Sequence, residues 1–265
     1  MKTLFVALLF ILLFVLPLVV LVFYTAAPGW SYPELFPSAL SSRSPAYLWR
    51  QRQDVLVSLG SSFTYSALTV LFTFCTCLLP ASVFARQEFK GKRLLESASL
   101  APALVPAITF SVGVHFLFIK IGLADRLMGV VLVLTVFSYP YMLRALVAGF
   151  LAYGSEYDLC ARNLGAGLLR RVIRVELPLL LPAVVAGGTV VFLVSFSEYF
   201  LVFLIGGGTV PSYTGYLFPF LNSSDRSIAS LLTLVFMAVP ILLFLLVDVL
   251  VAAVYRKRSM LEGTG

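Results

Sequence analysis

The chain has 265 residues, of which 60% are hydrophobic and 12% are charged, and its formal net charge at pH 7 is +7. Soluble domains average about 45–50% apolar and about 25% charged residues, so this composition excludes an ordinary water-soluble protein. The positive charge does not indicate nucleic-acid binding, because the basic residues lie in short connections beside apolar blocks. The three cysteines, Cys75, Cys77 and Cys160, form neither a disulfide framework nor a metal-binding motif.

Apolar blocks of about 20 residues recur along the chain, and a helix of that length crosses a hydrocarbon core of ~30 Å. A membrane barrel would instead alternate apolar and polar residues in segments of about ten. The first block exceeds the apolar core of about 7–15 residues found in signal peptides, so we expect a retained span. The sequence predicts an all-α polytopic membrane protein, one domain over residues 1–265, with six transmembrane helices at 4–24, 58–84, 98–119, 127–148, 179–205 and 228–254.

The distribution of Lys and Arg predicts the orientation of these spans. If the N-terminus is cytoplasmic, the connections on that side carry twelve basic residues and those on the other side carry six. Cytoplasmic connections are enriched in Lys and Arg, so we expect both termini in the cytoplasm. The two long external stretches are then 26–57 and 206–227, and the turn-forming residues of the second predict a loop or a re-entrant piece.

The connection over residues 154–178 is too polar to cross a membrane, yet its apolar positions recur at helical spacing. This pattern predicts two short surface helices that meet near Gly165. Glu156 and Asp158 come early and the arginines come late, an order that suits a helix dipole. Two interpretations fit this pattern: a helix–turn–helix that docks into a groove of a soluble partner, or an interfacial helix on lipid headgroups.

Within this connection, the segments Cys160-Ala161-Arg162-Asn163-Leu164-Gly165-Ala166 and Val175-Glu176-Leu177-Pro178 resemble the signature loop of permeases from binding-protein-dependent (type I) ABC importers. In that family an E-A-A stretch, a fixed glycine and an I-x-L-P ending form the coupling helix that sits in a cleft of the ATPase. Leu159 and Cys160 depart from the pattern, because Glu and Ala are usual there. The resemblance implies that the residues coupling to the ATPase are Ala161, Arg162, Gly165, Ala166, Leu177 and Pro178.

The same resemblance implies the partners: two ATP-binding subunits, a second permease subunit (homologous or identical), an external solute-binding protein and membrane lipid. The chain contains no G-x-x-x-x-G-K-[ST] loop, so ATP and Mg would be bound by the ATPase subunits, and this chain would be neither an enzyme nor a cofactor-binding protein. The implied location is the bacterial cytoplasmic (inner) membrane. Residues 197–210 and 217–219 look most similar to the polyamine, thiamine and ferric-iron permeases, which implies a small solute of the cationic type.

Polar residues inside predicted spans are candidates for the solute pathway, because such groups must face protein or water. Those candidates are Glu198, Ser195, Tyr199 and His115. Glu198 has two interpretations, as a group that lines the path of a cationic solute or as a group bonded to neighbouring helices. His115 is the only histidine and lacks the ligand set of a metal site, so helix packing or pore lining is favoured.

The main alternative is a secondary transporter or channel independent of ATP, which would share the spans and the charge bias. Such a protein would not need a glycine-broken docking loop before the fifth span. A zinc protease of the membrane is excluded, because the chain has one histidine and no H-E-x-x-H motif. Two roles stay open for the basic side chains of the loop, Arg162, Arg170 and Arg171. They could pair with an acidic rim of a partner protein, or they could face solvent or lipid phosphates.

Overall fold

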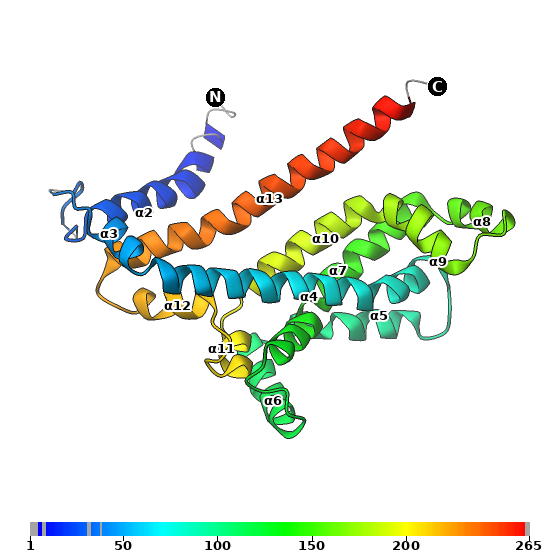
Figure 1. The fold of residues 1–265 in the computed structure, drawn as a ribbon, viewed down its shortest axis with the longest axis horizontal. Coiled ribbons are helices and arrows are strands. Elements are labelled where there is room, and N and C mark those ends of the chain that lie inside the picture. The colour runs from blue at the N-terminus through cyan, green and yellow to red at the C-terminus, as the bar shows by residue number, and fades with distance from the viewer. Residues whose placement is uncertain (1–4, 7–8, 31–32, 38, 263–265) are drawn as a thin grey trace. The chain divides into compact units, whose positions relative to one another are not determined.

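The computed structural model describes residues 5–6, 9–30, 33–37 and 39–262, with side chains up to 249 and at 251. This part of the chain is helical and contains no strand, which confirms the all-α prediction. Contacts within the chain define two compact units, a terminal unit of Met1–Leu59 with Tyr213–Gly265 and a central unit of Gly60–Ser212. Helix α4, labelled in Figure 1, comprises Arg52–Arg86. The boundary between the units falls after Leu59, so α4 contributes residues to both.

Four helices among the described residues are long and apolar enough to cross a membrane: Arg52–Arg86, Leu127–Tyr153, Leu168–Ser197 and Arg226–Val249. A further pair, Lys92–Leu104 and Ala107–Lys120, meets the same criterion together but is bent by 99°. The first predicted block corresponds to the shorter apolar helix Ile11–Ala26, and part of that block lies outside the described residues. The number of six spans and the cytoplasmic location of both termini stay predictions.

The predicted span at 98–119 is not one straight helix in the structure. Helix α5 (Lys92–Leu100) and the 3-10 helix η2 (Ala101–Leu104) end at Val105, and α6 (Ala107–Lys120) begins after Pro106. Val105 has an extended backbone, with φ −89° and ψ 130°. A proline disfavours helical geometry in the residue before it, so Pro106 accounts for the break that the apolar block conceals.

The terminal unit is built from the π-helix η1 (Ile11–Val15), α2 (Leu16–Ala26), α3 (Arg43–Arg50), the start of α4, α12 (Tyr213–Leu221) and α13 (Arg226–Glu262). Helix α2 packs along α13. The core of this unit gathers Val55, Tyr213, Leu217 and Leu232, and the buried Tyr213 hydroxyl donates to the Leu232 carbonyl at 2.8 Å.

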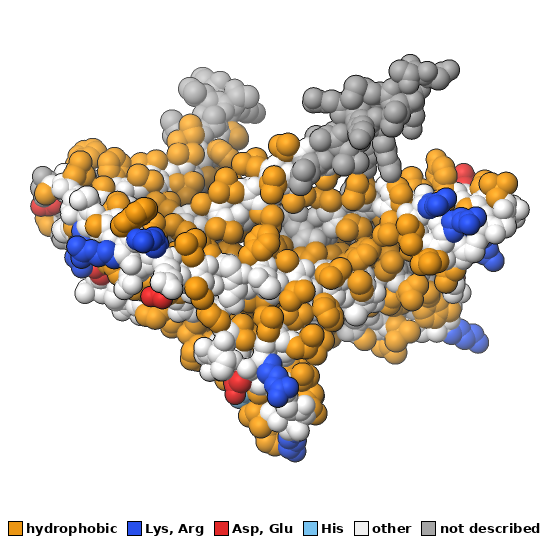
Figure 2. Space-filling model, in the orientation of Figure 1, with side chains coloured by type: hydrophobic (Ala, Val, Ile, Leu, Met, Phe, Trp, Pro, Cys, Tyr) orange, Lys and Arg blue, Asp and Glu red, His pale blue; other side chains and the backbone are white. Residues whose placement is uncertain are grey.

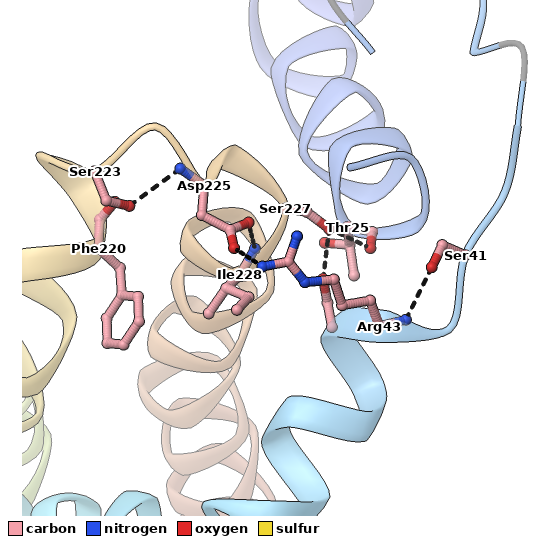
Figure 3. Close-up of polar contacts among 9 residues, drawn as sticks. Thr25, Ser41, Arg43, Phe220, Ser223, Asp225, Ser227 and Ile228 are labelled. Carbon is pink, nitrogen blue, oxygen red and sulfur yellow. Dashed lines mark hydrogen bonds and ion pairs between the residues drawn. The ribbon is translucent and has the colours of Figure 1, made fainter. Parts of the chain in front are cut away.

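Polar contacts join the helix ends of the terminal unit, as Figure 3 shows. The guanidinium of Arg43 at the start of α3 pairs with the carboxylate of Asp225 at 2.6 Å. The hydroxyl of Ser227 in α13 donates to the carbonyl of Thr25 in α2 at 3.0 Å. These bonds connect the C-terminal end of α2 with the N-terminal ends of α3 and α13.

The central unit is organised around α7 (Leu127–Tyr153), which lies against α10 (Leu177–Ser197). A Cβ atom added to Gly149 would lie 2.5 Å from the Ala183 Cβ, and one added to Gly187 would lie 2.8 Å from the Ala145 Cβ. Small residues at such contacts let helix backbones approach closely, which is how helices associate in lipid. The N-terminal half of α7 packs into one cluster of buried apolar side chains, and its C-terminal half packs into a second cluster together with α10.

Gly129 in the first turn of α7 provides a stability prediction. A Cβ atom there would lie 2.0 Å from the carbonyl oxygen of Leu123, so the backbone of the preceding turn would have to move. Overpacking of this kind costs ~1–3 kcal/mol, and we expect Gly129→Ala to lower the thermal denaturation midpoint of the purified protein in detergent. Gly113 in α6 is the matched control, because its Cβ would meet no atom within 4 Å. An unchanged midpoint for Gly129→Ala would contradict the close approach.

Candidate functional site

The polar connection that resembles the coupling loop, residues 154–178, folds as a helical hairpin around Gly165. Helix α8 (Glu156–Asn163) precedes the glycine; α9 (Leu168–Arg171) and the π-helix η3 (Val172–Glu176) follow it and continue into α10. The Gly165 N–H donates to the Arg162 carbonyl at 2.9 Å and the Ala166 N–H donates to the Ala161 carbonyl at 3.0 Å. This bond pair is the Schellman motif that ends helices, and it needs a residue with positive φ. Gly165 supplies a φ of 76°.

An ion pair closes this hairpin from within. The Arg171 guanidinium contacts both carboxylate oxygens of Asp158, with Nε–Oδ1 at 2.6 Å and Nη2–Oδ2 at 3.0 Å. Asp158 is buried, and a two-pronged Arg–carboxylate contact fixes orientation as well as distance. The pair therefore holds α9 against α8, and Arg171 is engaged within the chain, while Arg162 and Arg170 are exposed.

The outer surface of the hairpin is apolar with a basic border. Leu164 is 88% exposed and Leu169 is 74% exposed, and further exposed apolar side chains are Tyr157, Leu159 and Leu168. Figure 2 shows hydrophobic and basic side chains next to each other over α8 and α9. Ala161 and Ala166 are half-buried, as are Leu177 and Pro178 at the start of α10. We call residues 156–171 with this exposed leucine surface the docking hairpin.

The base of the docking hairpin is held by a buried ion pair. Arg86, the last residue of α4, lies 2.6 Å through Nη1 from the Glu176 Oε1, and its Nη2 donates to the Tyr153 hydroxyl at 2.8 Å. The guanidinium also lies over the ring of Phe150, 4.8 Å from its centroid. Sequence reasoning missed this group, because it counted Arg86 only among the twelve basic residues that predict the orientation of the spans. One signal for this group was available in the sequence. Glu176 is an acidic residue directly before an apolar block, where a carboxylate needs a partner.

The candidates for the solute pathway occupy two places in the central unit. Ser195, Glu198 and Tyr199 lie where α10 ends, and His115 lies in α6. In the part of the chain that the structure describes, the Ser195 Oγ and the His115 Nδ1 are buried and have no hydrogen-bond partner. The Tyr199 ring stacks on Phe203, with the ring centroids 5.5 Å apart.

Glu198 interrupts the predicted span at 179–205. Its backbone is extended, with ψ 123°, so α10 ends at Ser197 and α11 (Phe200–Gly206) begins separately. The Glu198 Oε1 accepts the backbone N–H of Leu201 at 3.3 Å. A carboxylate at the start of a helix satisfies N–H groups that have no partner inside the helix. Of the two interpretations of Glu198, this contact favours a structural role over lining the solute path.

Comparison with known proteins identifies relatives that are transport permeases, although no protein-family model matches the chain. Over 163 residues the chain is 30% identical to the molybdenum transport system permease protein ModB of Escherichia coli (strain K12), covering 56% of this chain and 68% of that protein. The molybdate/tungstate transport system permease protein WtpB of Pyrococcus abyssi is 24% identical over 151 residues, 57% of this chain and 60% of that protein.

A third relative is the probable sulfate transport system permease protein cysT of Nephroselmis olivacea, which is 29% identical over 163 residues, 57% of this chain and 56% of that protein. The chain thus spans 56% to 68% of the length of these three relatives. None of the three is named for polyamine, thiamine or iron, so the predicted subgroup finds no support in them.

A solved structure has the same fold. It is the crystal structure of a bacterial ABC transporter involved in the import of the acidic polysaccharide alginate, with a TM-score of 0.69 over 93% of each chain at 14% identity. The apolar helices and these relatives place the protein in the cytoplasmic (inner) membrane. From the relatives and the shared fold together, we conclude that the chain belongs to the family of ABC importer permeases.

Proposed function

We propose that this chain is the permease subunit of an ATP-driven importer, that it forms half of the solute pathway, and that it couples to a separate ATPase through residues 156–178. The observation that carries the proposal is the docking hairpin, a rigid turn at Gly165 that exposes leucines between basic side chains. Exposed apolar surface with a charged border is typical of a protein–protein contact. The ATPase groove that receives it would be apolar with an acidic rim.

The proposed assembly contains two ATP-binding subunits, which hold ATP and Mg, a second permease subunit and an external solute-binding protein. The orientation that this assembly requires places the docking hairpin and both termini in the cytoplasm. Co-purification in mild detergent separates this proposal from a secondary transporter, because only the permease should retain an ATPase. A chain that transports solute without any ATPase would overturn the proposal.

For the solute we propose a tetrahedral oxyanion of the molybdate, tungstate or sulfate type. The three relatives described above are named for molybdenum, for molybdate and tungstate, and for sulfate. The cationic solute expected from the sequence rested on the resemblance of residues 197–210 and 217–219 to other permeases. Glu198 was its candidate carboxylate, and in the structure that carboxylate accepts a backbone N–H of α11. No other carboxylate was a candidate for binding a cation along the pathway.

We expect molybdate, tungstate or sulfate to stimulate ATP hydrolysis by the complete transporter in proteoliposomes, with its binding protein present. Spermidine and thiamine serve as cationic controls and should leave the basal rate unchanged. Stimulation by a cation alone would refute the oxyanion while leaving the importer intact. Uptake of solute in the absence of ATP would favour the secondary transporter.

A further inference from the structure

One guanidinium joins both ends of the docking hairpin to a third helix. The chain leaves α7 at Tyr153, turns at Gly154 with a φ of 72°, and returns to α10 after Glu176. Arg86 at the end of α4 binds Tyr153 through Nη2 and Glu176 through Nη1. The entry and the exit of the hairpin are therefore fixed to each other and to α4 by a single side chain.

This attachment is buried, unlike the other ion pair near the end of α4. The Glu176 side chain is 7% exposed and that of Arg86 is 17% exposed, whereas in the Lys92–Glu88 pair the Glu88 side chain is 89% exposed. An exposed pair contributes little because water screens it, whereas loss of one partner of a buried pair leaves an uncompensated charge. The Arg86 anchor therefore resists displacement far more than the exposed pair does.

The hairpin beyond the Arg86 anchor is held together by its own contacts. The Asp158–Arg171 pair and the turn at Gly165 fix α8 against α9. The π-helix η3 follows α9 in the chain and leads to α10. At its end the Leu177 N–H donates to the Val172 carbonyl, and the next residue, Pro178, has no N–H to donate. Short π segments inside helices are frequent at functional sites.

We infer that Arg86, Glu176 and Tyr153 are positioning residues that transmit movement of the docking hairpin to α4 and α7. This inference rests on the proposed function, since the movement is that of an ATPase bound to the hairpin. Within the described residues the Arg86 Nε is buried and has no hydrogen-bond partner. A buried donor left unpaired costs stability, which indicates that this arrangement is not optimised for stability alone.

The test uses a double variant that removes both charges and leaves neither one buried alone. Arg86→Met with Glu176→Met replaces the pair by apolar side chains of similar length, a change that proteins often tolerate without loss of stability. We expect this variant to retain the ATPase on co-purification, because the docking hairpin is unchanged. We expect its ratio of solute-stimulated to basal ATP hydrolysis to fall roughly tenfold, within the range of about 5- to 150-fold usual for coupling between sites.

Two further measurements keep the inference falsifiable if the double variant does not fold. Arg86→Lys retains the charge but loses the fork that binds Glu176 and Tyr153 together, and Tyr153→Phe removes one arm. Both should lower the stimulation ratio while the ATPase stays bound. Lys92→Gln, which breaks only the exposed pair, is the control and should match the unmodified protein.

The outcomes separate this inference from the function on which it rests. If the folded variants stimulate ATP hydrolysis as well as the unmodified chain, the positioning role is wrong and the importer stands. If the variants release the ATPase, the Arg86 contacts are needed for ATPase binding, and the inference that they transmit movement is wrong. If the unmodified chain itself retains no ATPase, the proposed function and this inference both fall.

Discussion

Replacing Gly165 by valine is expected to abolish solute-stimulated ATP hydrolysis in the assembled transporter. Gly165 has a φ of 76°, and a β-branched residue in this conformation is strained by ~1–3 kcal/mol. No atom of the described chain lies within 4 Å of an added Cβ, so the substitution would not clash inside the protein. The variant should insert into the membrane normally, because the strain falls on the Schellman turn that shapes the docking hairpin. The measurement is ATP hydrolysis with and without the loaded binding protein.

Gly167 provides the matched control for this substitution. It lies two residues further along the same turn and is equally open, but its φ of −66° and ψ of 161° suit valine. Gly167→Val therefore adds the same side chain to the hairpin without backbone strain, and it should keep most of the stimulation. Normal stimulation of ATP hydrolysis in the Gly165→Val variant would count against the docking role. Equal losses of stimulation in both variants would show that the added side chain, and not backbone strain, causes the loss.

The sequence predicted the helical class and the central glycine of the hairpin, but it missed one local break in the backbone and one contact between distant residues. The helical class and the glycine at the centre of the hairpin follow from hydropathy and from the conformational freedom of glycine. The break at Pro106 was missed because averaged hydropathy does not register a local backbone restriction. The Arg86–Glu176 pair was missed because its partners are 90 residues apart in sequence.

The prediction of a cationic solute rested on a resemblance over residues 197–210 and 217–219, part of which is a tight turn in the structure. Residues 206–208 lie within the segment that resembles the polyamine, thiamine and iron permeases, and in the structure they make a tight turn with positive φ at Gly207 and Gly208. A Cβ added to Gly207 would lie 1.7 Å from the Asp125 Oδ1, and the Thr209 hydroxyl donates to the Asp125 carbonyl at 2.7 Å. Gly207 thus serves the packing of this turn, and packing carries no information on the solute.

Replacing Leu164 by aspartate is expected to release the ATPase from the purified permease. Leu164 is 88% exposed, so its replacement removes no contact within the described chain and should leave the thermal denaturation midpoint unchanged. Burial of a leucine side chain in a partner stabilises a complex by ~1.5–3 kcal/mol, so its loss should weaken ATPase binding by roughly 10- to 150-fold. The measurement is the amount of ATPase that remains bound after washing in detergent.

Leu94 in α5 is the matched control, because it is 74% exposed and lies in a different connection. Leu94→Asp adds the same charge to another largely exposed position and should retain the ATPase. The two variants together decide between the interpretations that the sequence left open for the hairpin. If the hairpin rests on lipid headgroups, Leu164→Asp should alter membrane association while ATPase retention stays normal. Selective loss of the ATPase from the Leu164 variant, with membrane insertion unchanged, is a result that only a protein groove around this leucine explains.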